Sequence, residues 1–268
     1  MGILRRTLLG AALAVLPPGA ALHAQEAGAD DEGVVVTPAV EPDALFALKR
    51  MGEYLRSLDT FRVSADTTQD EVADTGENIE LASHLDIEAR LPDRMRLDVT
   101  SDRNQRQYFY DGETVVIYAP AVGAYARFAA GTTIREALET AASQYDLELP
   151  LADLFTWGTA DDDSDLLVDA FSVGVTRMGG EDCEHFVFRQ EGIDWQLWLR
   201  TGDAPLPCRV VITTTDEPSQ PRYAATLDWT VGIDLPEDTF RFTPTDGSYE
   251  IAIEPSADEV PSADEEAE

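Results

Sequence analysis

Polar and apolar residues alternate along most of the chain after Phe61, and this alternation constrains the fold more than any other feature. It is clearest from Arg94 to Val99, where every second residue is apolar. A period of two is that of a β-strand with one buried and one solvated face, and such strands are typical of antiparallel sheets. Turn-forming residues separate the runs, above all Asp111-Gly112, a pair that favours hairpins. The sequence therefore predicts a meandering antiparallel sheet.

Residues 42–58 have helical spacing instead. Their apolar residues recur every three or four positions, which predicts a helix with one apolar face. These residues are Leu45, Leu48, Met51, Leu55 and Leu58. Pro42 suits the first turn of a helix, and Asp43 complements the helix dipole there.

Residues 132–155 are the second helical region. Thr132 or Thr133, followed by Glu136, matches the capping pattern of a helix N-terminus. The order of helix, strands, helices and strands predicts an α+β fold, a single curved antiparallel sheet covered by helices. A last short pair of strands is expected near Phe240 and Ile251.

The two ends of the chain differ from its middle. Residues 1–24 have the positive, apolar and small-residue regions of a signal peptide, which predicts export and cleavage near Ala24 by the general or the twin-arginine route. The alternative is a buried N-terminal helix. The apolar run is too short for a stable membrane anchor. We expect an acidic flexible lead-in at 25–41, one domain at 42–253 and a disordered acidic tail at 254–268.

The charge of the chain argues against partners with a strongly negative surface. There are 19 Lys and Arg residues against 52 Asp and Glu residues, a formal net charge of −33. Nucleic-acid phosphates and anionic lipid surfaces repel such a chain. We therefore expect no nucleic-acid partner.

Cys183 and Cys208 are the only cysteines. An even number of cysteines in an exported chain favours a disulfide, here closing a loop of about 25 residues. Two buried thiols or a redox pair are the alternatives. His185 lies two residues after Cys183, but only His84 accompanies it in the mature chain, too few for a three-histidine zinc site.

A calcium loop is the remaining metal motif to consider. Asp161, Asp163 and Asp165 resemble the start of such a loop, but Leu166 replaces the required Gly and Ser172 the required Glu. Nucleophile-elbow, phosphate-loop and dinucleotide motifs are absent from the sequence. We therefore predict no catalytic residues, no metal and no cofactor.

Several motifs together resemble a known family, the predicted periplasmic proteins called domain of unknown function 2092. These motifs are Asp111-Gly112, Gly180-Glu181-Asp182-Cys183-Glu184-His185, Asp194-Trp195-Gln196-Leu197-Trp198, Ala204-Pro205-Leu206-Pro207-Cys208-Arg209, Asp228-Trp229 and Phe240-Arg241-Phe242. The family is similar to the larger lipoprotein-carrier class (LolA/LolB-like). The resemblance covers roughly residues 42–253. It implies a half-open β-barrel closed by helices over an apolar cavity that binds acyl chains, and no established reaction.

Nine aromatic and aliphatic residues are candidates for the lining of that cavity. They are Tyr108, Tyr110, Tyr118, Tyr125, Leu138, Phe155, Trp157, Trp195 and Trp198. The alternative is that they fill a dry core, because aromatic residues are common in strands. Which face of each strand looks inward is left open at this point.

These observations favour an exported, periplasmic, non-enzymatic binding or carrier protein that encloses an apolar ligand. The expected partner is a lipid, an acyl chain or a lipoprotein. The first alternative is a protein-interaction or envelope-stress sensor module with a closed cavity, whose partner is an envelope protein. The second alternative is an unrecognised hydrolase.

Overall fold

The structure, a computed structural model, describes residues 39–73, 75–159 and 163–256. The predicted signal peptide, residues 25–38 of the lead-in and residues 257–268 of the tail lie outside these ranges, and their predictions stay untested. The described residues belong to one unit, Pro38–Glu268.

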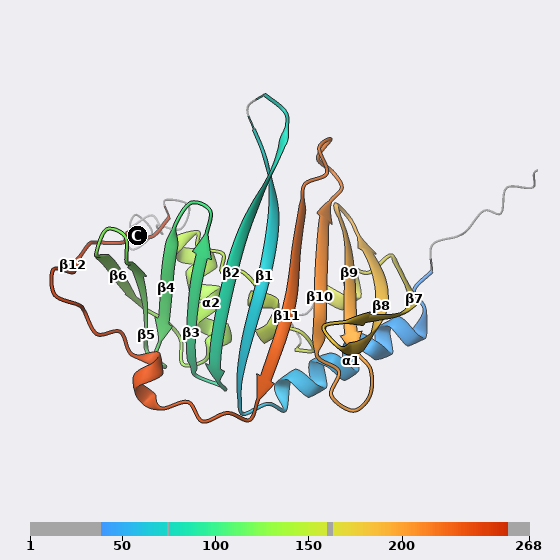
Figure 1. Cartoon of the computed structure of the whole chain (residues 1–268), viewed down its shortest axis with the longest axis horizontal. Helices are drawn as coiled ribbons and strands as arrows, with labels where there is room; N and C mark the ends of the chain where they lie inside the picture. Colours follow the sequence, from blue (N-terminus) through green and yellow to red (C-terminus); the bar gives the residue numbers. More distant parts are fainter. Residues whose placement is uncertain (1–38, 74, 160–162, 257–268) are drawn as a thin grey trace, which may run out of the picture. The chain divides into compact units, whose positions relative to one another are not determined.

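A single sheet forms the centre of the described chain (Figure 1). Its twelve strands lie in the order β12-β6-β5-β4-β3-β2-β1-β11-β10-β9-β8-β7. Their bounds are β1 Thr60–Val72, β2 Asn78–Arg90, β3 Arg94–Ser101, β4 Gln105–Tyr110, β5 Thr114–Ala119, β6 Ala124–Ala129, β7 Asp169–Met178, β8 Glu181–Gln190, β9 Ile193–Arg200, β10 Pro207–Thr214, β11 Arg222–Val231 and β12 Tyr249–Glu250. The sheet is curved and does not close, because β12 and β7 remain as its two edges (Figure 1).

The chain enters this sheet in the middle. Strands β1 to β6 are consecutive neighbours out to one side, and β7 to β11 return from the other edge until β11 pairs with β1. Pairing is antiparallel except between β12 and β6, which are parallel. The predicted single curved antiparallel sheet is therefore confirmed, with this one short parallel addition.

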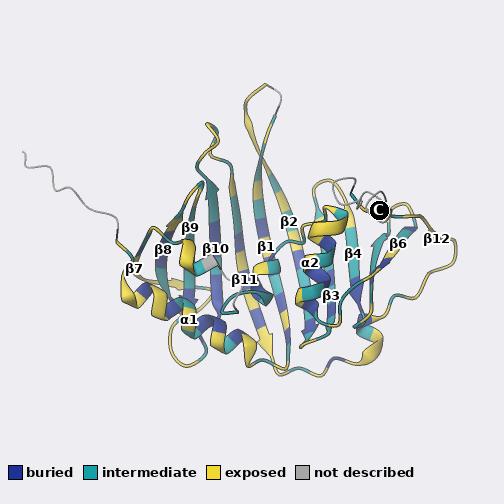
Figure 2. Ribbon diagram, turned by 180° about the vertical axis from the view of Figure 1, so that it is seen from behind, coloured by how far each residue is buried: buried dark blue, intermediate teal, exposed yellow. Residues whose placement is uncertain are grey.

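Two helices cover one face of the sheet, α1 (Pro42–Arg56) over β7 to β11 and α2 (Ile134–Tyr145) over β3 to β5 (Figure 2). Thr133 caps α2, because its hydroxyl accepts a hydrogen bond from Glu136 N while the Glu136 carboxylate accepts one from Thr133 N. The predicted helical region 132–155 is split. Asp146 ends α2 with a positive φ of 53°, and only a short 3₁₀ helix, η1 (Ala152–Phe155), follows.

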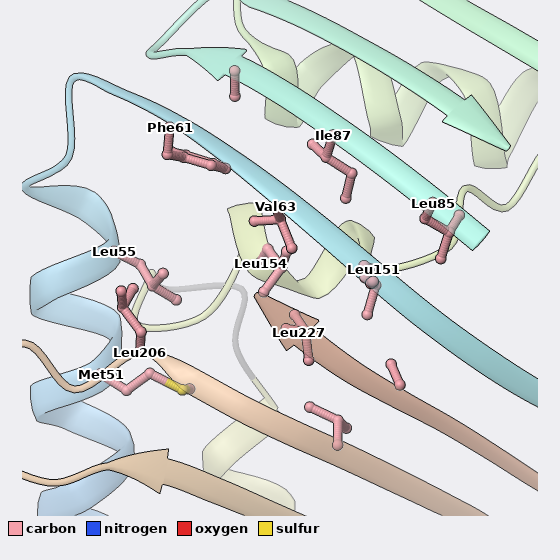
Figure 3. Packing of buried hydrophobic residues seen from close by; sticks show 14 of the residues in the cluster. Met51, Leu55, Phe61, Val63, Leu85, Ile87, Leu151, Leu154, Leu206 and Leu227 are labelled. Carbon is pink, nitrogen blue, oxygen red and sulfur yellow. The ribbon is translucent and has the colours of Figure 1, made fainter. Parts of the chain in front are cut away.

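The core lies between α1, η1 and the strands. Figure 3 shows Met51 and Leu55 of α1 beside Leu206, while Leu151 and Leu154 point toward the central strands. The buried stripe of α1 is rotated from the predicted one. Ala44 and Ala47 are buried, whereas Leu45 is 39% exposed.

The C-terminal part differs from its prediction. Phe240 is not in a strand but ends a 3₁₀ helix, η3 (Glu237–Phe240), and it is fully buried. Pro236 precedes this turn and has no N–H to give to a sheet. Ile251 lies just after β12, and its N–H still donates to Tyr125 O.

Candidate functional site

The alternation of the strands decides which candidate residues can share a cavity. In β9, Leu197 and Leu199 are buried on the helix-covered face, and Trp195 lies on the same face. Trp198 lies on the opposite face, which we call the open face. A one-residue step along a strand reverses the direction of the side chain.

One cleft, which we call the main cleft because two of the predicted lining residues face it, lies on the helix-covered face, between α1, residues 153–158 and strands β9 and β10. Its volume is about 220 Å³. It is lined by Leu48, Met51, Asp153, Thr156, Trp157, Gly158, Ser164, Gln190, Ile193, Trp195, Val210 and Ile212. Two of the predicted lining residues, Trp157 and Trp195, therefore lie here together. The Trp195 ring stacks on Phe188 at 4.1 Å, and its Nε1 donates to Gln190 Oε1 at 3.2 Å.

The sequence reasoning missed the aliphatic walls of the main cleft. Val210 and Ile212 occupy alternate positions of β10, and this alternation marks them as one face of a strand. Leu48 and Met51 belong to the predicted apolar face of the first helix, and that pattern gives no sign of a cleft. Only the packing of α1 against the sheet puts both pairs around one space.

Two glycines set the distance between α1 and the segment that follows η1. A Cβ built on Gly52 would lie 2.6 Å from Gly158 Cα, closer than real contacts allow. Gly158 itself has a φ of +72°. The two backbones approach so closely because neither residue has a side chain, and this contact forms one end of the main cleft.

The second cleft lies where β1, β2, β3 and β11 meet residues 148–150. Its volume is about 440 Å³. It is lined by Thr67, Gln69, Leu81, Ser83, Leu85, Val99, Ser101, Asp102, Arg103, Asn104, Glu148, Leu149, Pro150 and Tyr223. More than half of these side chains are polar. The segment 148–158 contributes to both clefts, so it forms the wall that they share.

The space under α2 is filled. A void of only about 10 Å³ remains among its apolar residues, room for about one water molecule and far too little for an acyl chain. The predicted lining residues Tyr108, Tyr110 and Leu138 lie here. The Tyr110 hydroxyl donates to Gly131 O, and burial, with smaller effects of nearby carboxylates, raises the pKa of Tyr110 to about 12. Phe155 also packs in the core, with its ring 6.0 Å from that of Phe61.

Three predicted lining residues lie on the open face. The Phe242 ring contacts both Tyr118 and Tyr125, with centroids 5.0 Å apart in each case. Trp198 stacks on His185 at 3.9 Å. The structure does not bring these three residues to either cleft of the helix-covered face. Their side chains point to the face of the sheet opposite to that of Tyr108 and Trp195.

Cys183 and Cys208 form a disulfide, as the sequence favoured. A bonded Cys183 holds no thiol for nucleophilic attack, which removes the Cys–His arrangement as a catalytic pair. His185 Nε2 is 3.1 Å from Gln196 Oε1. Burial lowers the pKa of His185, against the smaller opposite effect of this hydrogen bond.

A Ser–His–Asp chain crosses β1 and β2 on the open face. His84 Nδ1 is 2.8 Å from Asp66 Oδ1, and its Nε2 is 3.3 Å from Ser64 Oγ. Asp66 and His84 are 87% and 50% exposed in their side chains, and the hairpin register pairs them directly. Catalysis at such a chain needs hydrogen-bond donors preorganised for an oxyanion in a water-excluded site. Water reaches this chain freely, so its geometry favours a solvated polar cluster.

Among the residues that the structure describes, no group of three or more His, Cys, Asp or Glu residues is arranged to hold a metal ion. Asp161, part of the calcium-like sequence, lies outside the described residues. No described helix has the length and apolar content needed to cross a bilayer.

Solved structures with similarity to the chain have low identity. Lipoprotein LppX of Mycobacterium tuberculosis is 11% identical over 72% of this chain and 98% of its own, with a TM-score of 0.46. The LolA superfamily protein NE2245 of Nitrosomonas europaea is 10% identical over 74% and 97%, with a TM-score of 0.37. MucB, solved in complex with MucA(peri), is 17% identical over 75% and 60%, with a TM-score of 0.41.

No curated protein matches the chain. The model of one family, described as predicted periplasmic protein (DUF2092), matches residues 44–254, which include both clefts and the disulfide. The resemblance inferred from the sequence motifs is thereby confirmed: this periplasmic chain belongs to the DUF2092 family of predicted periplasmic proteins.

Proposed function

We propose that the protein is a non-enzymatic carrier that holds an apolar chain in the main cleft. The observation that carries this proposal is the cleft itself, an open space walled by two tryptophans and by aliphatic residues of α1, β9 and β10. Ligand sites are typically concave and mostly apolar, with a few polar groups. Each methylene group that leaves water contributes about 0.8 kcal/mol to binding.

The size of the main cleft implies that the protein moves to take up its ligand. Its volume of about 220 Å³ is below the roughly 300–1,000 Å³ of typical ligand sites. The segment 146–158 is the part that we propose to move. It begins at Asp146 and ends at Gly158, both with positive φ, and Leu151 between them also has a φ of 60°. A leucine in this conformation is strained, as is common in segments that switch.

The first experiment asks whether a ligand is present. Native mass spectrometry of the protein purified from its own cell envelope is expected to show added lipid mass. Fluorescent fatty-acid analogues are expected to bind the delipidated protein. A mass equal to that of the chain alone, together with no binding of these analogues, would contradict the proposal.

Two tryptophans of one strand give a matched pair of variants. Trp195→Ala removes a wall of the main cleft, and we expect it to weaken binding of the fatty-acid analogue at least tenfold. Trp198→Ala removes a ring of the same size from the open face, where it stacks on His185. The affinity of Trp198→Ala for the fatty-acid analogue should equal that of the wild type. Equal losses in both variants would show that the ligand does not lie in the main cleft.

A second candidate function is docking of an envelope protein at the edge of β7. Residues 39–41 hydrogen-bond the start of this strand, through Glu41 N to Ala170 O at 2.8 Å. Beyond Ser172, no strand of the described chain covers the outer edge of β7. Val173 and Val175 are 56% and 64% exposed there. An uncovered strand edge is a template for pairing with an added strand.

Val175→Arg tests this second candidate. If a partner protein adds a strand to β7, the variant should lose the partner in affinity purification from the envelope and keep its affinity for fatty-acid analogues. Retention of the partner by the variant would rule out this edge as the docking site.

A further inference from the structure

The Tyr223 hydroxyl is a buried polar group that no described residue satisfies. Tyr223 lies on the helix-covered face of β11, and its hydroxyl oxygen has no hydrogen-bond partner in the described chain. Burial, with a smaller effect of the Asp153 charge, raises the pKa of this phenol, so the hydroxyl keeps its proton at periplasmic pH. The group is therefore a permanent hydrogen-bond donor without an acceptor.

This hydroxyl is unusual among the buried ring polar groups of the protein. Tyr110 donates its hydroxyl proton to Gly131 O, and Trp229 Nε1 donates to Pro207 O at 2.8 Å. Buried polar groups of native proteins are generally satisfied, and the exceptions call for an explanation such as a functional role or a bound molecule. A ligand oxygen would supply the missing acceptor.

Tyr223 stands at the boundary between the two clefts. It lines the second cleft, and its cross-strand neighbour Ile212 lines the main cleft. Pro150 of the shared wall borders the second cleft and Asp153 the main cleft, and the Asp153 charge acts on the Tyr223 hydroxyl. A molecule that extends from the main cleft toward the second one, with the shared wall displaced, would therefore reach this hydroxyl.

The charges around the two clefts select against an anionic ligand. Asp153 lines the main cleft, and Asp102 and Glu148 line the second. Among the described residues that line the two clefts, Arg103 is the only basic one. Its guanidinium already binds the Glu71 carboxylate through contacts of 2.5 and 2.8 Å. A carboxylate or phosphate head group would find no unengaged basic side chain among the described lining residues and would lie near the carboxylates of Asp102 and Glu148.

The second cleft instead offers uncharged hydrogen-bonding groups. Thr67, Gln69 and Ser83 come from the halves of β1 and β2 that are nearer their connecting turn, and Asn104 comes from the turn before β4. Such amide and hydroxyl groups suit a head group with several hydroxyls. A quaternary ammonium head has no oxygen or N–H with which to engage Tyr223 or these groups.

We propose that the ligand is an uncharged amphiphile with ester and hydroxyl groups, whose acyl chain occupies the main cleft and whose polar linkage accepts a hydrogen bond from Tyr223. The inference rests on the proposed carrier function and adds to it the class of ligand. The hydroxyl groups of the ligand then face the second cleft.

Three probes with twelve-carbon chains test the head-group preference, each used below its micellar concentration. They are 1-monolauroylglycerol, laurate and dodecyltrimethylammonium, and binding is followed by the change in tryptophan fluorescence. We expect the wild-type protein to bind monolauroylglycerol at least tenfold more tightly than either charged probe. Equal or tighter binding of laurate or of the ammonium probe would overturn the inference while leaving the carrier function standing. No binding of any probe would overturn both.

Tyr223→Phe tests the hydrogen bond itself, with Tyr110→Phe as the matched control. Loss of one hydrogen bond of about 1.4 kcal/mol predicts roughly tenfold weaker binding of monolauroylglycerol by Tyr223→Phe. Its ligand-free melting temperature should stay equal or rise, because an unsatisfied hydroxyl is removed. Tyr110→Phe should melt earlier and bind normally. Unchanged affinity of Tyr223→Phe, or a fall in its melting temperature like that of Tyr110→Phe, would overturn the assignment.

Discussion

The two halves of the sheet are each covered by one helix, yet the space directly under α2 is filled, whereas a cleft remains beside α1. Under α2 the side chains leave a void of about 10 Å³, whereas the cleft beside α1 measures about 220 Å³. Small residues of α2, Ala137 and Ala141, allow close approach to the strands. On the other half, the segment 146–158 lies beside α1, and its residues 153–158 line the cleft. The difference lies in what covers the sheet, a closely packed helix on the filled half and α1 with the segment 146–158 around the open cleft.

The largest expected effect comes from the filled half. Phe128 is buried and its ring stacks on Tyr145 at 4.2 Å. Phe128→Ala should lower the free energy of unfolding by about 3–5 kcal/mol, because the site has no room to collapse further. Trp195→Ala, next to the open cleft, should lower it by a smaller amount. Chemical denaturation measures both, and a greater loss for Trp195→Ala would reverse our comparison of the two halves.

The disulfide stabilises the half that contains the main cleft. Cys183 and Cys208 join β8 to β10 and are 25 residues apart in sequence. Replacing both with Ala should lower the free energy of unfolding by about 3 kcal/mol, because the unfolded chain regains the freedom of that loop. Hydrogen exchange should increase in β8 to β10 and stay unchanged in β2 to β5. Equal increases in both halves would mean that the halves do not open separately.

A smaller effect is expected at the start of α2. Thr133→Ala removes the hydroxyl that accepts a hydrogen bond from Glu136 N at 3.2 Å, and should lower the free energy of unfolding by about 1 kcal/mol. Thr132→Ala is the control. The backbone N–H of residue 132 still donates to Glu136 Oε2 in this variant. The free energy of unfolding should therefore fall less in Thr132→Ala than in Thr133→Ala. If the two variants lose equally, the capping box does not anchor α2.

The smallest effects are two opposite pH dependences, one from each half. A hydrogen bond to Asp66, then the charges of Asp86 and Asp66, raise the pKa of His84 above 6.5, although partial burial opposes them. Its contribution to stability is present below pH 6.5 and is lost as pH rises through the folded pKa. Because the pair is exposed, we expect less than about 1 kcal/mol.

His185 should respond in the other direction. Burial lowers its pKa below 6.5 in the folded state, so the unfolded chain takes up a proton first as the pH falls. Stability should therefore decrease from pH 6.5 down to the folded pKa. Urea titrations of His84→Gln and His185→Gln over this range separate the contributions. If the difference in free energy of unfolding between the wild type and His185→Gln does not change with pH, the prediction is contradicted.

Much of the fold could be predicted because the relevant signals are local. The alternation around Met95 and Leu97 identified a strand, Asp111-Gly112 a hairpin, and Thr133 with Glu136 a helix start. Phe240 was predicted wrongly as a strand residue because a single buried aromatic does not distinguish a strand from a 3₁₀ turn. Leu45 was predicted to be in the apolar stripe, but the sheet contacts the neighbouring alanines of α1 instead.

The candidate site could be predicted only in part. The sequence identified Trp157 and Trp195, but it grouped them with Tyr118, Tyr125 and Trp198, which lie on the open face. Face assignment depends on the register between strands, and one residue of shift reverses it. The pairing of Tyr223 with Ile212, and of Asp66 with His84, depends in the same way on registers that no short pattern encodes.

The sequence by itself determined the class of the fold and the family, and it favoured the disulfide, because period, turn residues, cysteine number and motifs are properties of the linear chain. The tertiary structure alone decided which half of the sheet is filled and which residues face the two clefts. It also decided that Tyr223 places an unsatisfied hydroxyl between them. These features depend on distances between segments far apart in the chain, and side-chain packing fixes such distances only when the whole fold has formed.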